Sequence, residues 1–389
     1  MTANAKALDQ WIRGRFIDLN TALEDIYWCQ EDRANTEGVG DDLKQMLLTE
    51  GNELITALLA EGNTDEGFEA GFDLLGNVGF FMAACRRHEL TEPTRETHSP
   101  LREASALALQ VGASVGMIPR FSTAHLTTHN CAHGGVAKSF THGEDEAVFN
   151  EFNTRAILAY QRASEALLRV SRLGMTSPVA IDLLRNAKDA LDDVYASNEQ
   201  LNARLNVDRF FYSVRPYYKT YRVGHQSYRG ANAGDFAGIN VIDLLLGLCR
   251  GDDAYYSQLL VDKMLYMMPD DQALLRDVLR RRSLLSELKE ELSQSNQWPH
   301  QAQTIRSLLD VVDAHGRAAQ QHHDLLVDKF ITKPSKAMEE RHHGTLTASG
   351  PPLPVLLAAL EKLRDLRCAR QRSDVKTAYE DVELLRGRI

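Results

Sequence analysis

Apolar residues recur at the spacing of an α-helix through most of this 389-residue chain. A helix places side chains three and four residues apart on one face, whereas a strand changes face with every residue. In the stretch 41–61, the apolar positions at helical spacing are Leu43, Met46, Leu47, Leu54, Ile55 and Leu58. The same spacing occurs in residues 5–30, 67–87, 101–115, 147–173, 178–205, 235–248, 253–265, 270–291, 303–331 and 354–369. No long stretch alternates between apolar and polar residues, so the sequence predicts an all-α fold.

Composition narrows the class of protein. Hydrophobic residues make up 43% of the chain and charged residues 25%, which is ordinary for a globular enzyme. The net charge of −10 argues against a nucleic-acid partner, because phosphate contacts need a clustered basic surface. No stretch reaches the roughly 18 apolar residues of a membrane span, and residues 1–13 do not resemble a signal peptide. Five cysteines without a CxxC pair favour a reduced compartment, so we expect a cytoplasmic protein with no membrane partner.

His323 is the residue that most needs an explanation. It lies in the stretch 303–331, where a turn of 100° per residue brings it among apolar positions. Those within roughly 40° of Val312 by that rule are Ile305, Leu308, Ala319, Leu326 and Phe330. His322 falls near the edge of this face. A histidine among apolar side chains is either a core residue with a hydrogen-bonded ring or a ligand for a metal or haem, and the helix alone leaves both readings open.

Three irregular stretches interrupt the helical pattern, at residues 119–143, 212–234 and 332–354. Loops carry function more often than the elements that they connect. We therefore expect these loops to form the rim of a pocket.

The first of these loops offers an alternative metal site. His125, His129 and His133 are spaced four residues apart, and on a helix the first two would share a face and could chelate zinc. The surrounding threonines, Asn130 and the Gly134–Gly135 pair are poor helix formers. A loop with exposed or hydrogen-bonded histidines is the competing interpretation.

Arg215 stands in an aromatic segment, between Phe210 and Tyr218. Such an arginine can stack on aromatic rings as a purely structural residue. It can equally present its guanidinium group to the carboxylate of a ligand in an apolar pocket. Pro216 ends any helix at this point, which favours a position at the edge of a pocket.

Several short motifs in the same order resemble the indoleamine 2,3-dioxygenase superfamily of histidine-ligated haem enzymes, and within it most closely the PrnB (monodechloroaminopyrrolnitrin synthase) family. The motifs carrying the resemblance are Gly79-Phe80-Phe81, Arg86-Arg87-His88, Pro119-Arg120, His125, Thr127, Asn130, Ser139-Phe140-Thr141, Phe210, Arg215-Pro216, Arg222-Val223-Gly224, Gln226-Ser227-Tyr228, and His323 with Leu326, Val327, Lys329, Phe330, Ile331 and Pro334. The resemblance covers residues 58–360.

The resemblance implies an all-α, indoleamine 2,3-dioxygenase-like fold with haem b between long helices. It implies that His323 is the proximal ligand of the haem iron, that Arg215 binds the carboxylate of an amino-acid substrate, and that Phe210 packs against its aromatic ring. It further implies that Ser349 and Gly350, in the loop 347–350, contact the substrate.

The chain departs from the family pattern at several positions. Gln320 stands where family members often carry an arginine that contacts a haem propionate, so His322 or Arg317 would have to replace that contact. His225 replaces a small residue and would bring a polar group to the substrate pocket. Pro351 and Pro352 follow the substrate loop and would stiffen it.

The sequence thus predicts a haem-dependent oxygenase or oxidase that acts on tryptophan or a related aromatic amino acid, with O2 as co-substrate and an electron donor as a further partner, in natural-product biosynthesis. We expect an N-terminal helical domain, 1–118, over the distal side of the haem and a haem-binding domain, 119–389. The alternatives are a non-catalytic haem-binding sensor or carrier, a non-haem metal enzyme that uses His125, His129 and His133, and a helical interaction protein without a cofactor.

Overall fold

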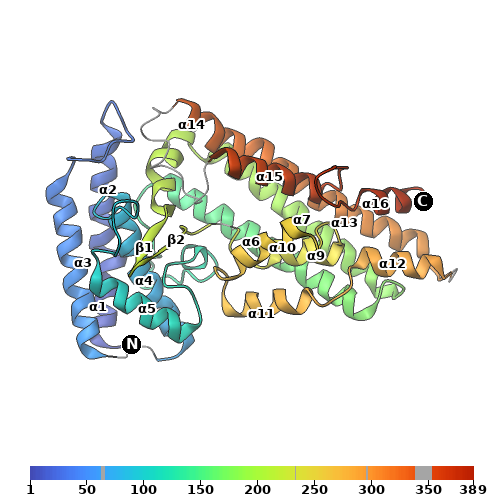
Figure 1. Cartoon of the computed structure of the whole chain (residues 1–389), viewed down its shortest axis with the longest axis horizontal. Coiled ribbons are helices and arrows are strands. Elements are labelled where there is room, and N and C mark those ends of the chain that lie inside the picture. Colours follow the sequence, from blue (N-terminus) through green and yellow to red (C-terminus); the bar gives the residue numbers. More distant parts are fainter. Residues whose placement is uncertain (63–65, 233, 295–296, 338–352) are drawn as a thin grey trace. The chain divides into compact units, whose positions relative to one another are not determined.

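The computed structural model describes residues 1–62, 66–232, 234–294, 297–337 and 353–389. Over these residues the elements are almost entirely helical, with one antiparallel sheet of two strands (Figure 1). The predicted all-α fold class is therefore confirmed. Within the described part of the chain, no helix is both long enough and apolar enough to cross a bilayer.

Chain packing divides the protein into two compact units that are interleaved along the sequence. Unit 1 consists of residues 1–151, 204–235 and 329–353, and unit 2 consists of residues 152–203, 236–328 and 354–389. The functional division into residues 1–118 and 119–389 stays a prediction.

Unit 1 contains a helical N-terminal half followed by short, irregular elements. They are α1 (Ala3–Arg13), α2 (Arg15–Trp28), α3 (Asp41–Glu61), α4 (Phe68–Arg87), α5 (Arg102–Val115), η1 (Thr123–Leu126), α8 (Val207–Arg209), η2 (Phe210–Val214), η3 (Arg215–Tyr218), β1 (Tyr221–Val223), β2 (Gln226–Tyr228) and α14 (Lys333–Ala337).

Helix α4 forms the centre of unit 1. Its side chains are buried around nearly the whole circumference from Gly71 to Arg87, as expected for a helix that is enclosed by other elements. Helices α1, α3 and α5 pack against it, as do η3 and β1. The backbone of the segment before η1 comes closest at Gly79, where an added Cβ would lie 2.3 Å from the amide nitrogen of Phe121. This close approach explains why a glycine stands in the Gly79-Phe80-Phe81 motif.

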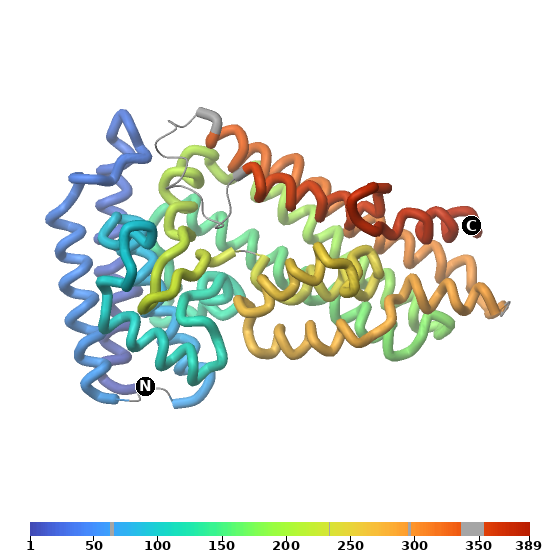
Figure 2. The backbone as a smooth tube through the Cα atoms, in the orientation of Figure 1, coloured from blue at the N-terminus to red at the C-terminus, as the bar shows by residue number. Residues whose placement is uncertain are grey.

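Unit 2 is built on longer helices. They are most of α6 (Glu144–Leu173), α7 (Pro178–Arg204), α9 (Gly238–Leu246), α10 (Ala254–Met264), α11 (Pro269–Val278), α12 (Leu284–Ser293), α13 (Gln301–Gln321), the start of η4 (His322–Thr332), α15 (Leu353–Arg367) and α16 (Tyr379–Arg386). Apolar residues from these helices, among them Leu184, Ile242 and Leu308, share one core. The final helices return along α13: Figure 2 shows the red trace of α15 beside the orange trace of α13, and Gly316 lies against the backbone of Arg367.

Local capping residues explain where the predicted helices break. The stretch 5–30 is divided into α1 and α2 at Gly14. The stretch 270–291 is two helices, because the Ser283 hydroxyl accepts a hydrogen bond from the amide of Ser286 at 3.2 Å and starts α12 there, as a serine N-cap does. The prediction of a single helix in each of these stretches was wrong.

Candidate functional site

The helix that carries His323 changes its geometry at this residue. Helix α13 ends at Gln321, and η4 continues as a π-helix over His322–Thr332. A π-helix bonds residue i to i+5 and often marks a functional position. The changed period shifts the angular positions that a turn of 100° per residue assigns. The expected place of His323 inside the apolar face was therefore wrong: Ile305 and Leu308 are buried, but the His323 side chain is 23% exposed.

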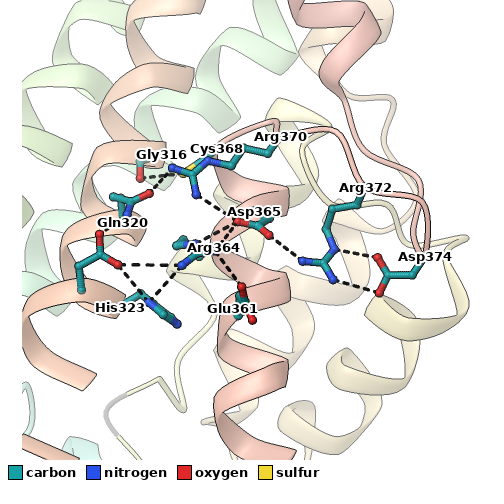
Figure 3. Close-up of polar contacts among 11 residues, drawn as sticks. Gly316, Gln320, His323, Glu361, Arg364, Asp365, Cys368, Arg370, Arg372 and Asp374 are labelled. Atoms are coloured by element: carbon teal, nitrogen blue, oxygen red, sulfur yellow. Dashed lines mark hydrogen bonds and ion pairs between the residues drawn. The ribbon is translucent and has the colours of Figure 1, made fainter. Parts of the chain in front are cut away.

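The two ring nitrogens of His323 have different surroundings (Figure 3). Nδ1 lies 3.1 Å from Oδ1 of Asp324 and 3.3 Å from a guanidinium nitrogen of Arg364, which comes from α15. Nε2 has no hydrogen-bond partner among the residues that the structure describes. An imidazole with Nδ1 engaged by a carboxylate and a free Nε2 has the arrangement of a metal-ligating histidine.

The other residues predicted near the cofactor are occupied or exposed. The Gln320 side chain donates to Oδ2 of Asp324 and accepts a hydrogen bond from Arg370. Arg317 forms a surface ion pair with Asp192 at 2.9 Å, and His322 is exposed. The structure thus brings Gln320 and His323 into one polar network, to which Arg317 and His322 contribute no described contact.

Helix α15 is fixed against α9 and α13 by a buried ionic cluster. Asp243 of α9 is fully buried and accepts hydrogen bonds from Arg367 at 2.8 to 3.2 Å, from Nε2 of His315 at 2.7 Å and from Tyr256 at 2.8 Å. Although burial alone would raise the pKa of Asp243, the adjacent Arg367 and His315 lower it far below the ordinary value. Because Arg367 and Arg364 lie on the same helix, the cluster also positions Arg364 beside His323.

Arg215 in unit 1 is a buried cation without an acidic partner among the described residues. Its side chain is 7% exposed, and its described contact is with the ring of Phe211, 5.2 Å from the guanidinium carbon. Burial lowers the pKa of Arg215 to about 10, so the group stays charged at neutral pH. A buried, unpaired guanidinium is unfavourable by itself and is suited to the carboxylate of a ligand.

Phe210 begins the π-helical turn η2 and lies in an aromatic cluster of unit 1. Its ring is 5.0 Å from that of Phe149 and 5.8 Å from that of Phe330. The turn and the 3-10 helix η3 that follows it are not α-helical, and Pro216 accounts for the change because it has no amide hydrogen to donate.

The remaining predicted substrate residues are not brought to Arg215 by a described contact. His225 occupies the turn between β1 and β2, where its exposed ring lies 6.1 Å from that of His98. Ser349 and Gly350 lie outside the described residues.

The histidine loop does not form the alternative metal site. His125 is buried in η1, with Nδ1 accepting from the amide of Ser122 at 2.9 Å and Nε2 lying 2.7 Å from the carbonyl oxygen of Phe72. Burial lowers its pKa to about 3, so the ring is neutral and both nitrogens are in use. Nδ1 of His129 contacts Thr128 and Nδ1 of His133 contacts Asp9. Among the described residues, no group of three or more histidine, cysteine or acidic side chains is arranged to hold a metal ion.

Other residues of the family motifs form buried ion pairs within the fold. Arg87 forms a two-point ion pair with Glu24 at 2.7 and 2.9 Å, and Arg120 pairs with Asp235 at 2.8 Å. These four side chains are buried. By contrast, Arg215 and Nε2 of His323 have no polar partner among the described residues of their own units, so both remain candidates for binding a ligand.

Three residues beside His323 were missed by the sequence analysis. Asp324 is the next residue in the chain, and a carboxylate adjacent to a candidate ligand is a signal that could have been used. Arg364 and Arg370 are 41 and 50 residues away from the groups that they contact, and no local pattern indicates them.

Comparison with known families covers the whole of this region. The family model described as monodechloroaminopyrrolnitrin synthase PrnB matches residues 2–389. The match extends over essentially the whole sequence, including both units and the segments that carry Arg215 and His323. The chain therefore belongs to the PrnB family of synthases.

Proposed function

We propose that this protein is a haem-dependent oxygenase or oxidase that acts on tryptophan or a related aromatic amino acid in natural-product biosynthesis. The observation that carries the proposal is the imidazole of His323, with Nδ1 beside Asp324 and Nε2 free of described partners. A neutral imidazole that binds iron through one nitrogen needs its proton on the other, and a carboxylate holds the proton there. In this proposal the cofactor is haem b, and His323 would hold its iron through Nε2.

If haem is bound there, it would supply the activation of dioxygen. The task of the protein is then to hold the substrate in a fixed orientation and to exclude water. An external electron donor belongs to the proposal, because oxidase chemistry at iron requires the ferrous state before dioxygen binds.

Arg215 supports the amino-acid part of the proposal. Its guanidinium group is buried and charged, and no described residue neutralises it. A substrate carboxylate would supply the missing charge through two parallel hydrogen bonds. Phe210, five residues earlier in an aromatic cluster, supports an aromatic substrate ring, because aromatic rings pack favourably edge to face or offset.

The non-catalytic haem carrier is the second interpretation of the same histidine. A carrier has no use for a buried cation that no described residue neutralises, so Arg215 favours the enzyme. The non-haem metal enzyme has no comparable support, because both ring nitrogens of His125 have partners.

The decisive experiment is an absorption spectrum of the purified protein after haem addition, recorded oxidised, reduced, and reduced with carbon monoxide. Each spectrum is recorded again after addition of L-tryptophan and, as a matched control, of tryptamine, which lacks the carboxylate. We expect the Soret band of an imidazole-ligated haem and a shift with L-tryptophan that tryptamine does not produce.

The possible outcomes separate the interpretations. A Soret band without any response to aromatic amino acids would favour the carrier. A protein that binds no haem would refute the proposal in both forms. A response of equal size to tryptamine would remove Arg215 from the substrate site.

A further inference from the structure

A chain of hydrogen bonds in unit 2 leads from Arg370 to His323. Arg370 donates to the carbonyl oxygen of the Gln320 side chain, and the amide group of Gln320 donates to Oδ2 of Asp324. Oδ1 of Asp324 then lies 3.1 Å from Nδ1 of His323. Figure 3 labels three of these side chains: Gln320 near the end of α13, His323 in η4, and Arg370 in the segment after α15.

The direction of the bonds in this chain fixes the position of a proton. A guanidinium group only donates hydrogen bonds and an ionised carboxylate only accepts them. The Gln320 side chain does both: its oxygen accepts from Arg370 and its nitrogen donates to Asp324. The contact between Asp324 and Nδ1 therefore requires an N–H group on His323, which would place the ring proton on Nδ1. The lone pair is then on Nε2.

Arg364 provides the competing arrangement at the same nitrogen. Its guanidinium nitrogen lies 3.3 Å from Nδ1 of His323 and 4.0 Å from Oδ1 of Asp324. A bond from Arg364 to Nδ1 would require the proton on Nε2, and a protonated Nε2 cannot bind iron. The bonds from Arg364 to Asp365 at 2.8 Å and to Glu361 at 3.3 Å come from Nη2, whereas its contact with His323 comes from Nη1. Because Asp324 lies closer to Nδ1, at 3.1 Å, we assign the bond at this nitrogen to Asp324.

We infer that Asp324 is the positioning residue of His323, and that Gln320 and Arg370 hold Asp324 in place. The inference rests on the proposed role of His323 as an iron ligand. In this arrangement Gln320 supports Asp324 and does not contact the cofactor, because its side-chain nitrogen and oxygen both have partners. Arg370, from the segment after α15, becomes part of the support of the ligand.

A hydrogen bond from Nδ1 to a carboxylate increases the electron donation of an imidazole to iron, and it stabilises the ferric state relative to the ferrous state. Replacing Asp324 by asparagine keeps the shape of the side chain and removes its charge. We expect the Asp324→Asn variant to show a lower iron–histidine stretching frequency in the ferrous state, a higher reduction potential and haem binding weakened about tenfold or more.

The matched control is Asp313→Asn on helix α13, which directly precedes η4. Asp313 forms a surface ion pair with Arg386, so this variant makes the same change of charge away from His323. It should leave the stretching frequency and the potential unchanged. Asp324→Glu, which restores the carboxylate, should recover part of the change seen in Asp324→Asn.

Gln320→Leu tests the remainder of the chain without removing a charge. It should shift the stretching frequency in the same direction as Asp324→Asn, by a smaller amount, because Asp324 keeps its charge but loses its orientation. If Asp324→Asn fails to fold, this variant still decides the question. Wild-type stretching frequencies in the folded variants would overturn the inference, whereas failure of His323→Ala to change haem binding would instead overturn the proposed function.

Discussion

The guanidinium carbon of Arg215 lies 5.2 Å from the centre of the Phe211 ring, so a buried cation of unit 1 rests on an aromatic ring. A cation on a ring gains about 0.5–2 kcal/mol, which is less than the cost of burying an unpaired charge. The difference has to be offset elsewhere, and binding of a carboxylate ligand is the means that we propose. Arg215 thus connects a local packing feature with a prediction about substrate.

Removal of the Arg215 side chain should weaken binding of the amino acid. Loss of a buried, charge-assisted pair costs about 2–5 kcal/mol, so Arg215→Ala should raise the dissociation constant for L-tryptophan by roughly 30-fold or more. Arg209→Ala is the matched control, because Arg209 also stacks on a ring, at 3.8 Å from that of Trp28. A spectroscopic titration that finds equal affinity in the two variants would contradict the carboxylate role.

Adjacent histidines allow a direct test of the proposed iron ligand. His323→Gly should lose the Soret band of bound haem, and added imidazole should restore it by occupying the vacated space. His322→Gly, which removes the same group one residue earlier, should keep the spectrum of the unchanged protein, since His322 is exposed and has no described contact with this network. The reverse result would move the ligand to His322.

The charge of Asp9 should make unit 1 sensitive to acid. Burial alone would raise the pKa of Asp9, but Lys138 and Arg13, at 3.1 and 2.9 Å, lower it to about 2. Because the pKa of Asp9 is lower in the folded state, its ionised carboxylate stabilises the fold at pH values above the unfolded-state pKa near 4. This stabilisation is lost as the pH falls through the folded-state pKa. At neutral pH the contribution is about 2 kcal/mol.

Urea unfolding at two pH values tests this assignment. Asp9→Asn should be less stable than the unchanged protein by about 2 kcal/mol at pH 6, and the difference should shrink at pH 3. Glu53→Gln, which removes an exposed carboxylate on α3, should show neither effect. A difference between the Asp9 variant and the unchanged protein that stays constant with pH would contradict the ion-pair explanation.

Gly79 should not tolerate a larger side chain. A Cβ at this position would lie 2.3 Å from the amide nitrogen of Phe121, and backbone cannot move aside as a flexible side chain can. Gly79→Ala should therefore cost roughly 1–3 kcal/mol or more. At Gly387 the nearest atom to an added Cβ is 3.6 Å away, so Gly387→Ala should stay within roughly 0.5 kcal/mol. Thermal unfolding of the two variants gives the comparison.

The buried cluster around Asp243 should depend on Arg367. Removing one partner of a buried pair leaves an uncompensated charge and costs about 3–5 kcal/mol. Arg367→Met should lose that amount, because Asp243 is fully buried. Arg185→Met, which breaks an exposed pair with Asp182, should have little effect. Equal denaturation midpoints for the two variants would show that the cluster does not hold α15 in place.

The sequence by itself determined the class of fold and most of its helices. Helix α3 was predicted with the bounds that the structure gives, because its apolar spacing, its acidic first turn and the glycine at its end are all local signals. Local signals also drew attention to Arg215, which stands among aromatic residues, and to His323, although the apolar face expected around His323 was wrong. A pattern of this kind depends only on neighbours along the chain.

Tertiary structure decided which polar residues have hydrogen-bond or ion-pair partners within the fold. Nothing near Arg87 in the sequence indicates Glu24, which lies 63 residues away and accepts hydrogen bonds from Nε and Nη2 of its guanidinium group. The same holds for Arg370, which reaches Gln320 across 50 residues, and for the carbonyl oxygen of Phe72 that occupies His125. Contacts between distant segments are set by packing, which a helical period does not encode. For this reason the sequence could nominate candidate residues, whereas only the folded chain could show which of their polar groups have no partner among the described residues of their own unit.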